Sequence, residues 1–258
     1  MLHPRIIPNL LIHNKGLVKT INFKNPKYVG DPINAVKIFN EKSVDELIVT
    51  DIDATVNNLE PNYDVIKKLA MECRMPLCYG GGIKNVDQAK KIFSLGVEKV
   101  SLSSSAINNP NIISKLANSV GSQSVVVVID VKKRFFGNKY EILTHNGTKK
   151  TGINPLDFIE SINNKGVGEI VINSIDRDGT MEGYDYKLID KVRNVTTLPM
   201  TILGGAGSLE DIGDLISRYK IIGSGAGSMF VFKGKYRAVL INYPNDKEKI
   251  DLIKKYMK

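Results

Sequence analysis

Residues 46–53, Glu-Leu-Ile-Val-Thr-Asp-Ile-Asp, decide the fold, because this stretch occurs twice in the chain. Residues 169–176, Glu-Ile-Val-Ile-Asn-Ser-Ile-Asp, repeat it at an offset of 123 residues, and residues 199–205 repeat residues 76–82 at the same offset. Each copy is a short β-branched run that ends in a carboxylate, which is typical of a buried strand. The constant offset predicts two similar halves packed together, since either half alone would leave two strand edges unpaired.

Outward from these copies, β-branched runs alternate with longer amphipathic stretches along the whole chain. Eight such βα units in about 250 residues predict a closed (βα)8 barrel of the TIM type rather than an open doubly wound sheet. We therefore expect a single barrel domain over residues 1–258, built from half-barrels at about 1–122 and 123–258. The predicted strands are residues 5–12, 46–51, 76–79, 99–102, 125–131, 169–173, 200–203 and 220–223. The predicted helices are residues 32–41, 63–73, 86–95, 110–120, 155–165, 186–195, 209–217 and 246–258.

Two segments lie outside this alternation, residues 16–30 and residues 134–152. Each follows the first strand of a predicted half, on the barrel face where active-site loops lie. We expect β-ribbons or flexible loops there. Lys19, in the first segment, is therefore a candidate contact to a substrate.

The composition excludes several classes of protein. Of the 258 residues 42% are hydrophobic and 24% are charged, which does not fit disordered, collagen-like or coiled-coil chains. The net charge is +9, but the basic residues are scattered, so nucleic acid is not expected as a partner. No apolar run approaches the ~20 residues of a membrane span, and prolines interrupt the apolar N-terminus, unlike an export signal. We expect a cytoplasmic protein that does not contact membranes.

Metal and disulfide chemistry are not predicted. Cys73 and Cys78 form no CxxC pair, and the three histidines, His3, His13 and His145, are spread along the chain. This pattern lacks metal-ligand spacing and favours reduced, packed thiols. We expect neither a metal nor a cofactor.

Glycine-rich loops follow the third strand of each predicted half, at residues 80–82 and 204–207, and serine-rich loops follow the fourth strands, at residues 101–106 and 224–228. Glycines allow the backbone to approach an anion, which free N–H groups bind. The repeated pairs predict two phosphate cups on opposite sides of the barrel mouth, suited to a ligand with a phosphate at each end. The alternative is that the glycines only relieve crowding at strand ends.

A carboxylate ends the fifth predicted strand. Asp130 follows the apolar run of residues 125–129, and a carboxylate at the C-terminal end of a barrel strand is well placed as a general acid or base. For the carboxylates at the ends of the second and sixth strands, capping of loops is an equally good explanation. These carboxylates are Asp51, Asp53, Asp176 and Asp178.

Charged residues also begin four predicted strands, at Arg5, Glu46, Lys99 and Glu169. Their side chains are expected to converge at the opposite end of the bore, where two cations and two anions seal it by mutual pairing. The alternative is a purely structural plug, because this face of a barrel usually contributes to stability.

Together these residues resemble the cyclase subunit of imidazole glycerol phosphate synthase, HisF, over essentially the whole chain. Many segments match in the right order. They include Arg5-Ile-Ile, Gly30-Asp-Pro, Asp45-Glu-Leu, Gly80-Gly-Gly-Ile, Gly121-Ser-Gln-Ser, Lys150-Thr-Gly, Ser174-Ile-Asp-Arg-Asp-Gly-Thr, Gly183-Tyr-Asp and Gly204-Gly-Ala-Gly.

The resemblance implies a partner, a HisH-like glutaminase that docks on the barrel bottom and releases ammonia into the bore. The four charged residues Arg5, Glu46, Lys99 and Glu169 then form the ammonia gate, and Glu98 faces the glutaminase. The resemblance also assigns catalysis to Asp130, with Lys19 and Asp51 retained. It assigns phosphate binding to Gly82, Ser103, Ser104, Asp178, Gly179, Gly205, Gly227 and Ser228.

The chain departs from the family at the end of the first strand. The second aspartate that the family uses for cyclisation is replaced by Leu11, which cannot transfer a proton, and Asn9 and Leu203 also replace family residues. The pattern is similar to HisF paralogues associated with acetamidino-sugar modification of surface polysaccharides, which work with a glutaminase and a separate sugar amidotransferase. We expect an ammonia-receiving subunit of that kind. The alternatives are a histidine-pathway cyclase and a non-catalytic phosphate-binding activator of a glutaminase.

Overall fold

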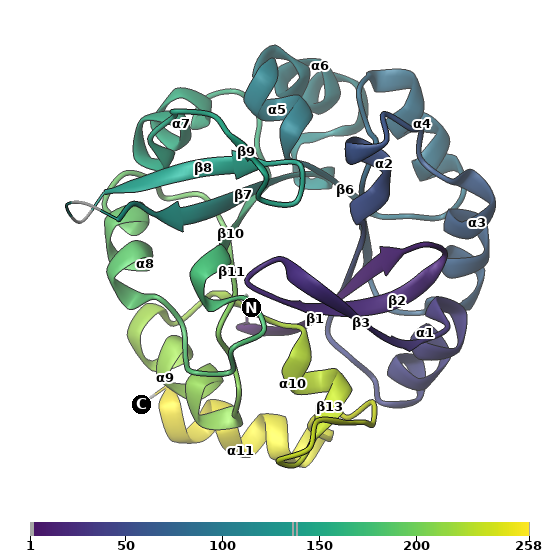
Figure 1. The fold of residues 1–258 in the computed structure, drawn as a ribbon, viewed down its shortest axis with the longest axis vertical. Coiled ribbons are helices and arrows are strands. Elements are labelled where there is room, and N and C mark those ends of the chain that lie inside the picture. The colour runs from purple at the N-terminus through teal and green to yellow at the C-terminus, as the bar shows by residue number, and fades with distance from the viewer. Residues whose placement is uncertain (1–2, 136, 138, 258) are drawn as a thin grey trace.

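Eight parallel strands form a closed ring in the computed structural model, which describes residues 3–135, 137 and 139–257 (Figure 1). The ring consists of β1 (Arg5–His13), β4 (Leu47–Asp51), β5 (Leu77–Gly80), β6 (Lys99–Leu102), β7 (Val125–Lys133), β10 (Glu169–Ser174), β11 (Met200–Leu203) and β12 (Gly223–Ala226). The fold is the (βα)8 barrel that the sequence predicts.

Parallel pairing closes the ring in the order β1, β4, β5, β6, β7, β10, β11, β12 and back to β1. The closing pair joins Arg5 of β1 to Gly223 of β12. In this order β1 lies opposite β7, and the β5–β6 pair lies opposite the β11–β12 pair. The ends of β5 and β6 therefore lie across the mouth from the ends of β11 and β12.

Helices cover the outside of the ring (Figure 1). Several begin at a side chain that accepts a hydrogen bond from the first turn, such as Asp31, Asn85 and Ser208. The main helices are α1 (Pro32–Glu41), α3 (Tyr63–Glu72), α4 (Val86–Ser94), α6 (Asn111–Val120), α7 (Pro155–Ile162), α8 (Tyr186–Arg193), α9 (Leu209–Tyr219) and α11 (Asp246–Tyr256). None of the helices in the described ranges has the length and apolar character of a membrane span. Residue 258, in the last predicted helix, lies outside those ranges.

The last barrel strand corrects one prediction. The strand expected at residues 220–223 is wrong, because β12 runs over Gly223–Ala226. A Cβ on Gly223 would lie 1.8 Å from Thr201 Oγ1, so only glycine fits beside the Thr201 side chain. This strand therefore consists of small residues and lacks the β-branched run on which the prediction relies.

Short helical turns follow several strands where the sequence predicts loops. They lie at the same end of the barrel as the expected cups, because they come directly after the C-terminal ends of β4, β6, β10 and β12. They are α2 (Ile52–Val56), α5 (Ser104–Asn108), α10 (Ser228–Val231) and the 3₁₀ turn η2 (Ile175–Arg177); a further turn, η1 (Ser122–Ser124), precedes β7.

Both segments outside the βα alternation form β-ribbons, which is one of the two forms expected for them. β2 (Gly16–Ile21) pairs antiparallel with β1 and with β3 (Lys24–Gly30). β8 (Tyr140–Thr144) pairs with the extended β7 and with β9 (Lys149–Lys150); residues 136 and 138 of this segment lie outside the described residues. A third hairpin, β13 (Phe232–Lys233) with β14 (Ala238–Val239), is not anticipated by the sequence reasoning.

Candidate functional site

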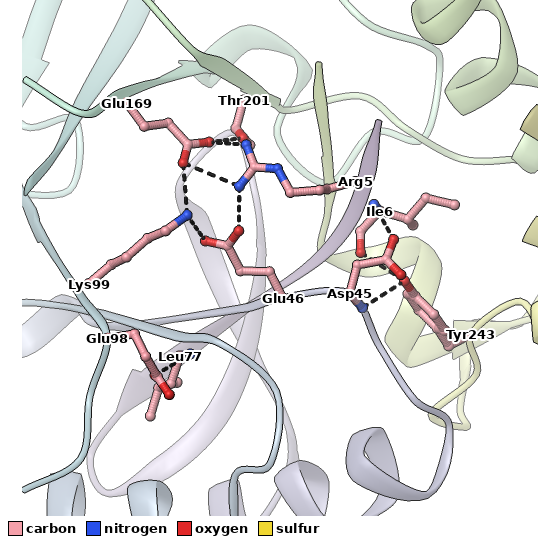
Figure 2. A network of polar contacts seen from close by, with 10 residues as sticks. All are labelled: Arg5, Ile6, Asp45, Glu46, Leu77, Glu98, Lys99, Glu169, Thr201 and Tyr243. Atoms are coloured by element: carbon pink, nitrogen blue, oxygen red, sulfur yellow. Dashed lines mark hydrogen bonds and ion pairs between the residues drawn. The ribbon is translucent and has the colours of Figure 1, made fainter. Parts of the chain in front are cut away.

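The four charged residues at the strand starts meet at the lower end of the bore (Figure 2). Arg5 bonds to Glu46 and donates from Nη2 to Glu169 Oε1 at 2.7 Å. The Lys99 amine lies 2.7 Å from Glu46 Oε1 and 3.0 Å from Glu169 Oε2. Each cation therefore bridges both carboxylates, and the four residues form a closed charged ring.

Burial and mutual attraction oppose each other in this ring. The Glu46 and Glu169 residues are 3% and 5% exposed. Burial alone would raise the pKa of Glu169, but the hydrogen bonds and charges of Arg5 and Lys99 outweigh it and lower that pKa. Burial likewise disfavours the charged form of Lys99, yet Glu169 and Glu46 raise its pKa. Pairing therefore favours the charged forms of Glu169 and Lys99 despite their burial.

Thr201 is a fifth member of the ring, which the sequence pattern does not predict. Thr201 is fully buried, and its hydroxyl donates to Glu169 Oε1 at 2.5 Å. The sequence feature that could have indicated this position is Gly223 on the neighbouring strand, because a glycine there leaves room for the Thr201 side chain. Glu169 thus accepts hydrogen bonds from Arg5, Lys99 and Thr201.

Glu98, the expected contact to a partner, is exposed beside the ring (Figure 2). Its Oε2 accepts a hydrogen bond from the Leu77 backbone N–H at 2.8 Å. One carboxylate oxygen is thus engaged in tying β6 to β5.

An apolar belt lines the bore above the ring. Alternate residues of a strand face the same side, so the residues two positions beyond Arg5, Glu46 and Glu169 also point into the bore. The belt consists of Ile7, Ile48, Cys78, Val126, Val171 and Leu203, all at most 5% exposed. Burial raises the pKa of the Cys78 thiol, so this cysteine is a neutral apolar side chain, as predicted.

The upper end of the barrel opens into a cavity of about 420 Å³. The ends of β5 and β6 contribute Gly82, Ser103 and Ser104 to its wall, and Asp51 and Asp130 line it as well. The structure therefore brings one predicted phosphate cup and two predicted catalytic carboxylates to a single cavity.

Asp130, on β7, lies partly buried at this cavity. Its Oδ1 accepts a hydrogen bond from Asn173 Nδ2 at 2.9 Å. Burial raises the pKa of Asp130 to about 7, the negative charge of Asp178 adds to the increase, and the Asn173 hydrogen bond opposes it. A carboxyl group that titrates near neutral pH can both donate and accept a proton.

The second predicted cup surrounds a small cavity of about 20 Å³, across the mouth from the first. Its wall contains Lys19 together with Asp178, Gly179, Gly205, Gly227 and Ser228. The volume holds about one water-sized group, which is the size of a single phosphate oxygen.

Lys19 reaches this small cavity from the β2–β3 ribbon. It is 4% exposed, and its amine donates to the Asn9 carbonyl. Burial lowers the pKa of Lys19 to about 8, although Asp178 favours its charged form. A Cβ at position 227 would lie 2.7 Å from the Lys19 Nζ, so glycine there allows the amine to approach the backbone. Burial raises the pKa of Asp178, whose carboxylate accepts a hydrogen bond from Thr20 at 2.7 Å.

Several polar atoms around the mouth lack a partner. Within the described part of the chain, the side-chain oxygens of Asn9, Ser103 and Asn173 are buried without a hydrogen bond. Asn9 and Asn173 line both cavities, and Ser103 lines the larger one. Unsatisfied buried polar atoms are uncommon in proteins and concentrate where ligands or ordered waters bind.

Asp51 caps the first turn of α2, accepting from the backbone of Asp53 at 3.0 Å and of Ala54 at 3.2 Å. This agrees with the capping alternative considered for it, although its side chain also lines the large cavity. Burial raises the pKa of Asp51. Asp176 is engaged as well, because its Oδ2 accepts from the Lys133 N–H at 2.7 Å.

A histidine–carboxylate pair at the cavity rim was not assigned from the sequence. His13 Nδ1 lies 2.6 Å from Asp53 Oδ1, and Asp53 Oδ2 accepts from the Asn14 N–H at 2.7 Å. His13 lines the large cavity at the end of β1. The sequence signal is faint, because the two residues are 40 positions apart and no spacing rule links them.

Leu11 lies on β1 between Asn9 and His13 and lines both cavities. It pairs across the ribbon with Val18 and across the barrel sheet with Thr50. An apolar side chain therefore occupies the β1 position that faces the cavity from the side opposite Asp130.

Comparison with known proteins agrees with this architecture. The family model for a histidine biosynthesis protein matches residues 5–237. A protein of Leptospira interrogans, provisionally named a HisF subunit of imidazole glycerol phosphate synthase, is 58% identical over 249 residues, covering 96% of this chain and 98% of that relative. A similarly named protein of Vibrio vulnificus is 57% identical over 249 residues, covering 96% of each chain.

More distant relatives carry the same name without qualification. The HisF subunit of imidazole glycerol phosphate synthase from Clostridium botulinum strain Okra is 38% identical over 233 residues, covering 90% of this chain and 92% of the relative. The family match and these identities extend over nearly the whole barrel, including both of its ends. The chain therefore belongs to the histidine biosynthesis protein family and is similar to the HisF subunits of imidazole glycerol phosphate synthase.

Proposed function

We propose that this chain is the ammonia-receiving subunit of a glutamine amidotransferase, paired with a HisH-like glutaminase and acting in the amidination of a sugar. The observation that carries the proposal is the layering of the bore. A charged ring lies at one end, a belt of apolar side chains follows, and a cavity with a titratable carboxyl group lies at the other end. Ammonia is a small neutral base, which an apolar bore accepts more readily than an ion.

The glutaminase docks against the lower face, where Glu98 is exposed, and the charged ring is the ammonia gate. All four ion pairs are formed in this structure. Passage of ammonia therefore requires at least one of them to break, and a buried pair breaks only at a considerable cost. Docking of the glutaminase supplies that free energy.

A phosphorylated ligand occupies the upper face. The two cups lie on opposite sides of the mouth, one around Gly82 and Ser104 and the other around Gly205 and Gly227. Lys19 supplies a cation to the second cup. Asp130 lies between them, and its pKa of about 7 suits proton transfer to or from nitrogen.

Leu11 favours sugar amidination over cyclisation. Cyclisation needs a proton acceptor and a proton donor at the mouth, and a leucine at this position removes one of them. Loss of one acid–base group typically lowers a rate by ~10²–10⁴. The chain then delivers ammonia to a separate sugar amidotransferase in the biosynthesis of surface polysaccharide.

A second candidate function is the cyclase of histidine biosynthesis, with Asp130 working alone. The names of the relatives favour it, since those at 36–38% identity are HisF subunits of imidazole glycerol phosphate synthase.

Two experiments test the proposal. The chain is first combined with its glutaminase, and glutamine hydrolysis is measured with wild type and with Glu46→Gln, a gate variant. We expect wild type to stimulate hydrolysis and the variant to change the coupling between hydrolysis and product formation. No stimulation would contradict the proposed partnership.

The second experiment is complementation of a histidine auxotroph, with wild type, Leu11→Asp and Leu11→Asn. We expect growth with Leu11→Asp alone, because aspartate can transfer a proton whereas asparagine, of the same shape, cannot. Growth with wild type would overturn the sugar assignment and establish the cyclase.

A further inference from the structure

Cations without counter-ions collect at one side of the mouth. The β2–β3 ribbon, residues 16–30, contains three lysines, and the segment around the β13–β14 hairpin, residues 227–242, contains two lysines and an arginine. Neither segment contains an aspartate or a glutamate. In the described part of the chain, none of these six residues forms an ion pair with a carboxylate within 4.0 Å.

Two of the lysines are direct cross-strand neighbours. Lys19 of β2 pairs with Lys27 of β3 in the antiparallel register. Directly opposed residues place their side chains on the same face of the ribbon, and like charges there are destabilising. Lys19 already has its amine buried at the small cavity. Lys27 is therefore the next cation outward from that cavity.

Arg237 of the neighbouring hairpin lies beside Lys27. The Lys27 amine donates to the Arg237 carbonyl at 3.3 Å. Both cations lie over the same ring, with Lys27 Nζ 5.1 Å and Arg237 Cζ 5.6 Å from the centre of Phe232. Arg237 also donates to the backbone carbonyl of Gly179, and Gly179 lines the small cavity. The β13–β14 hairpin thus brings the Arg237 guanidinium to the edge of the second phosphate cup.

Within the described residues neither Lys27 nor Arg237 has a carboxylate partner, so a bound anion would supply the missing negative charge. The Phe232 ring attracts both cations and so helps to keep them together at this edge of the mouth. The nearby carboxylate of Asp178 is partly buried and already accepts hydrogen bonds from the Thr20 hydroxyl and the Phe23 N–H. A guanidinium group next to an ammonium group is a common arrangement for binding phosphate oxygens.

We propose that Lys27 and Arg237 form a second phosphate subsite, continuous with the small cavity that contains Lys19, so that this side of the mouth selects a diphosphate group over a single phosphate. The inference rests on the proposed function, because it takes the small cavity as the site of the first phosphate. Lys19 and the glycine loops bind the inner phosphate, and Lys27 and Arg237 bind the outer one. The ligand class is therefore a diphosphate ester.

The test uses inorganic phosphate and inorganic pyrophosphate as probes, with binding to the full chain measured by calorimetry at low salt. We expect wild type to bind pyrophosphate at least about tenfold more tightly than phosphate, because the outer subsite adds charge-assisted hydrogen bonds. In the double variant Lys27→Gln/Arg237→Gln this preference falls to about twofold, while phosphate binding stays within about twofold of wild type.

Lys235→Gln is the matched control. It removes one cation from the same hairpin at an exposed position and is expected to leave the pyrophosphate preference within about twofold of wild type. Equal losses in Lys235→Gln and the double variant would overturn the subsite, because general attraction would then explain the preference. Phosphate binding with no added affinity for pyrophosphate would overturn the subsite alone. Absence of binding for both anions would overturn the cup as well, and with it this part of the proposed function.

Discussion

The two ends of the bore contrast in how they use buried polar groups. At the lower end, Glu46 and Glu169 are buried, and each meets both cations of the ring. At the upper end Lys19 is buried and Asp130 is partly buried, yet among the described residues neither contacts an oppositely charged partner. The charges at the lower end are all paired without a ligand, whereas those at the upper end are not.

The pKa shifts express this difference. At the ring, pairing overcomes burial and favours the charged form of Glu169. At the mouth burial prevails, raising the pKa of Asp130 to about 7 and lowering that of Lys19 to about 8. Groups that titrate near working pH are characteristic of functional sites. The charges of the ring are thus matched within the protein, whereas the mouth holds titratable groups that remain open to a ligand, as the proposed function requires.

The largest expected effect is at the ring. We expect Glu169→Ala to lower the free energy of unfolding by about 3–5 kcal/mol, because it leaves Arg5 and Lys99 with half of their partners. Urea unfolding monitored by circular dichroism measures the change. Glu72→Ala removes an exposed pair with Lys37 at 3.5 Å and is expected to cost less than about 1 kcal/mol. Equal costs for the two variants would remove the contrast between buried and exposed pairs.

At the mouth, replacement of a partly buried ionisable group is expected to raise the free energy of unfolding rather than lower it, and the change depends on pH. The folded pKa of Asp130 is about 7, above its ordinary value of 3.8, so the folded state binds the proton more tightly than the unfolded state. Its contribution to stability is therefore complete below about pH 4 and is lost as pH rises to about 7.

Asp130→Asn removes this dependence. We expect the variant to be more stable than wild type at pH 8, by a few kcal/mol, and close to wild type at pH 4. Unfolding in urea at both pH values provides the measurement, with the pH 4 pair as internal control. A variant destabilised equally at both pH values would show that Asp130 is paired as well as the ring residues are.

Removal of one hydroxyl group from each end of the bore tests the same contrast between paired and unpaired polar groups. Thr201→Val is expected to cost about 1.5–3 kcal/mol, since the Thr201 hydroxyl donates to a buried carboxylate. Ser103→Ala removes a hydroxyl without a partner in the described chain and is expected to change stability by less than about 0.5 kcal/mol. Thermal unfolding of the two variants gives the difference, and a larger loss for Ser103→Ala would contradict it.

A small effect is also expected at the cavity rim. His13→Gln breaks the contact with Asp53 at a partly exposed position, where a pair contributes about 0–1 kcal/mol. Asp53 still accepts the Asn14 N–H, so the turn remains closed. Thermal unfolding is expected to shift by no more than that amount. A loss as large as that of Glu169→Ala would place a structural ion pair at the mouth too.

Much of the site follows from strand periodicity. The starts of β1, β4, β6 and β10 lie at one end of a parallel barrel, so Arg5, Glu46, Lys99 and Glu169 were expected to converge, and they do. Thr201 escaped this reasoning, because a threonine inside a strand is usual and only the Gly223 contact reveals its position. The predicted boundary of β12 was wrong because this strand consists of small residues, which have a low strand propensity.

By itself, the sequence determined the closed parallel barrel, its repeat and the end at which each charged residue lies, because periodicity and strand polarity are local properties. Only the tertiary structure decided which distant residues meet. His13 meets Asp53, and Lys27 meets Arg237 from a hairpin that the sequence did not predict. These contacts join residues 40 and 210 positions apart. Burial and pairing arise from the whole fold, so the titration of Asp130 and Lys19 could not be derived from the chain alone.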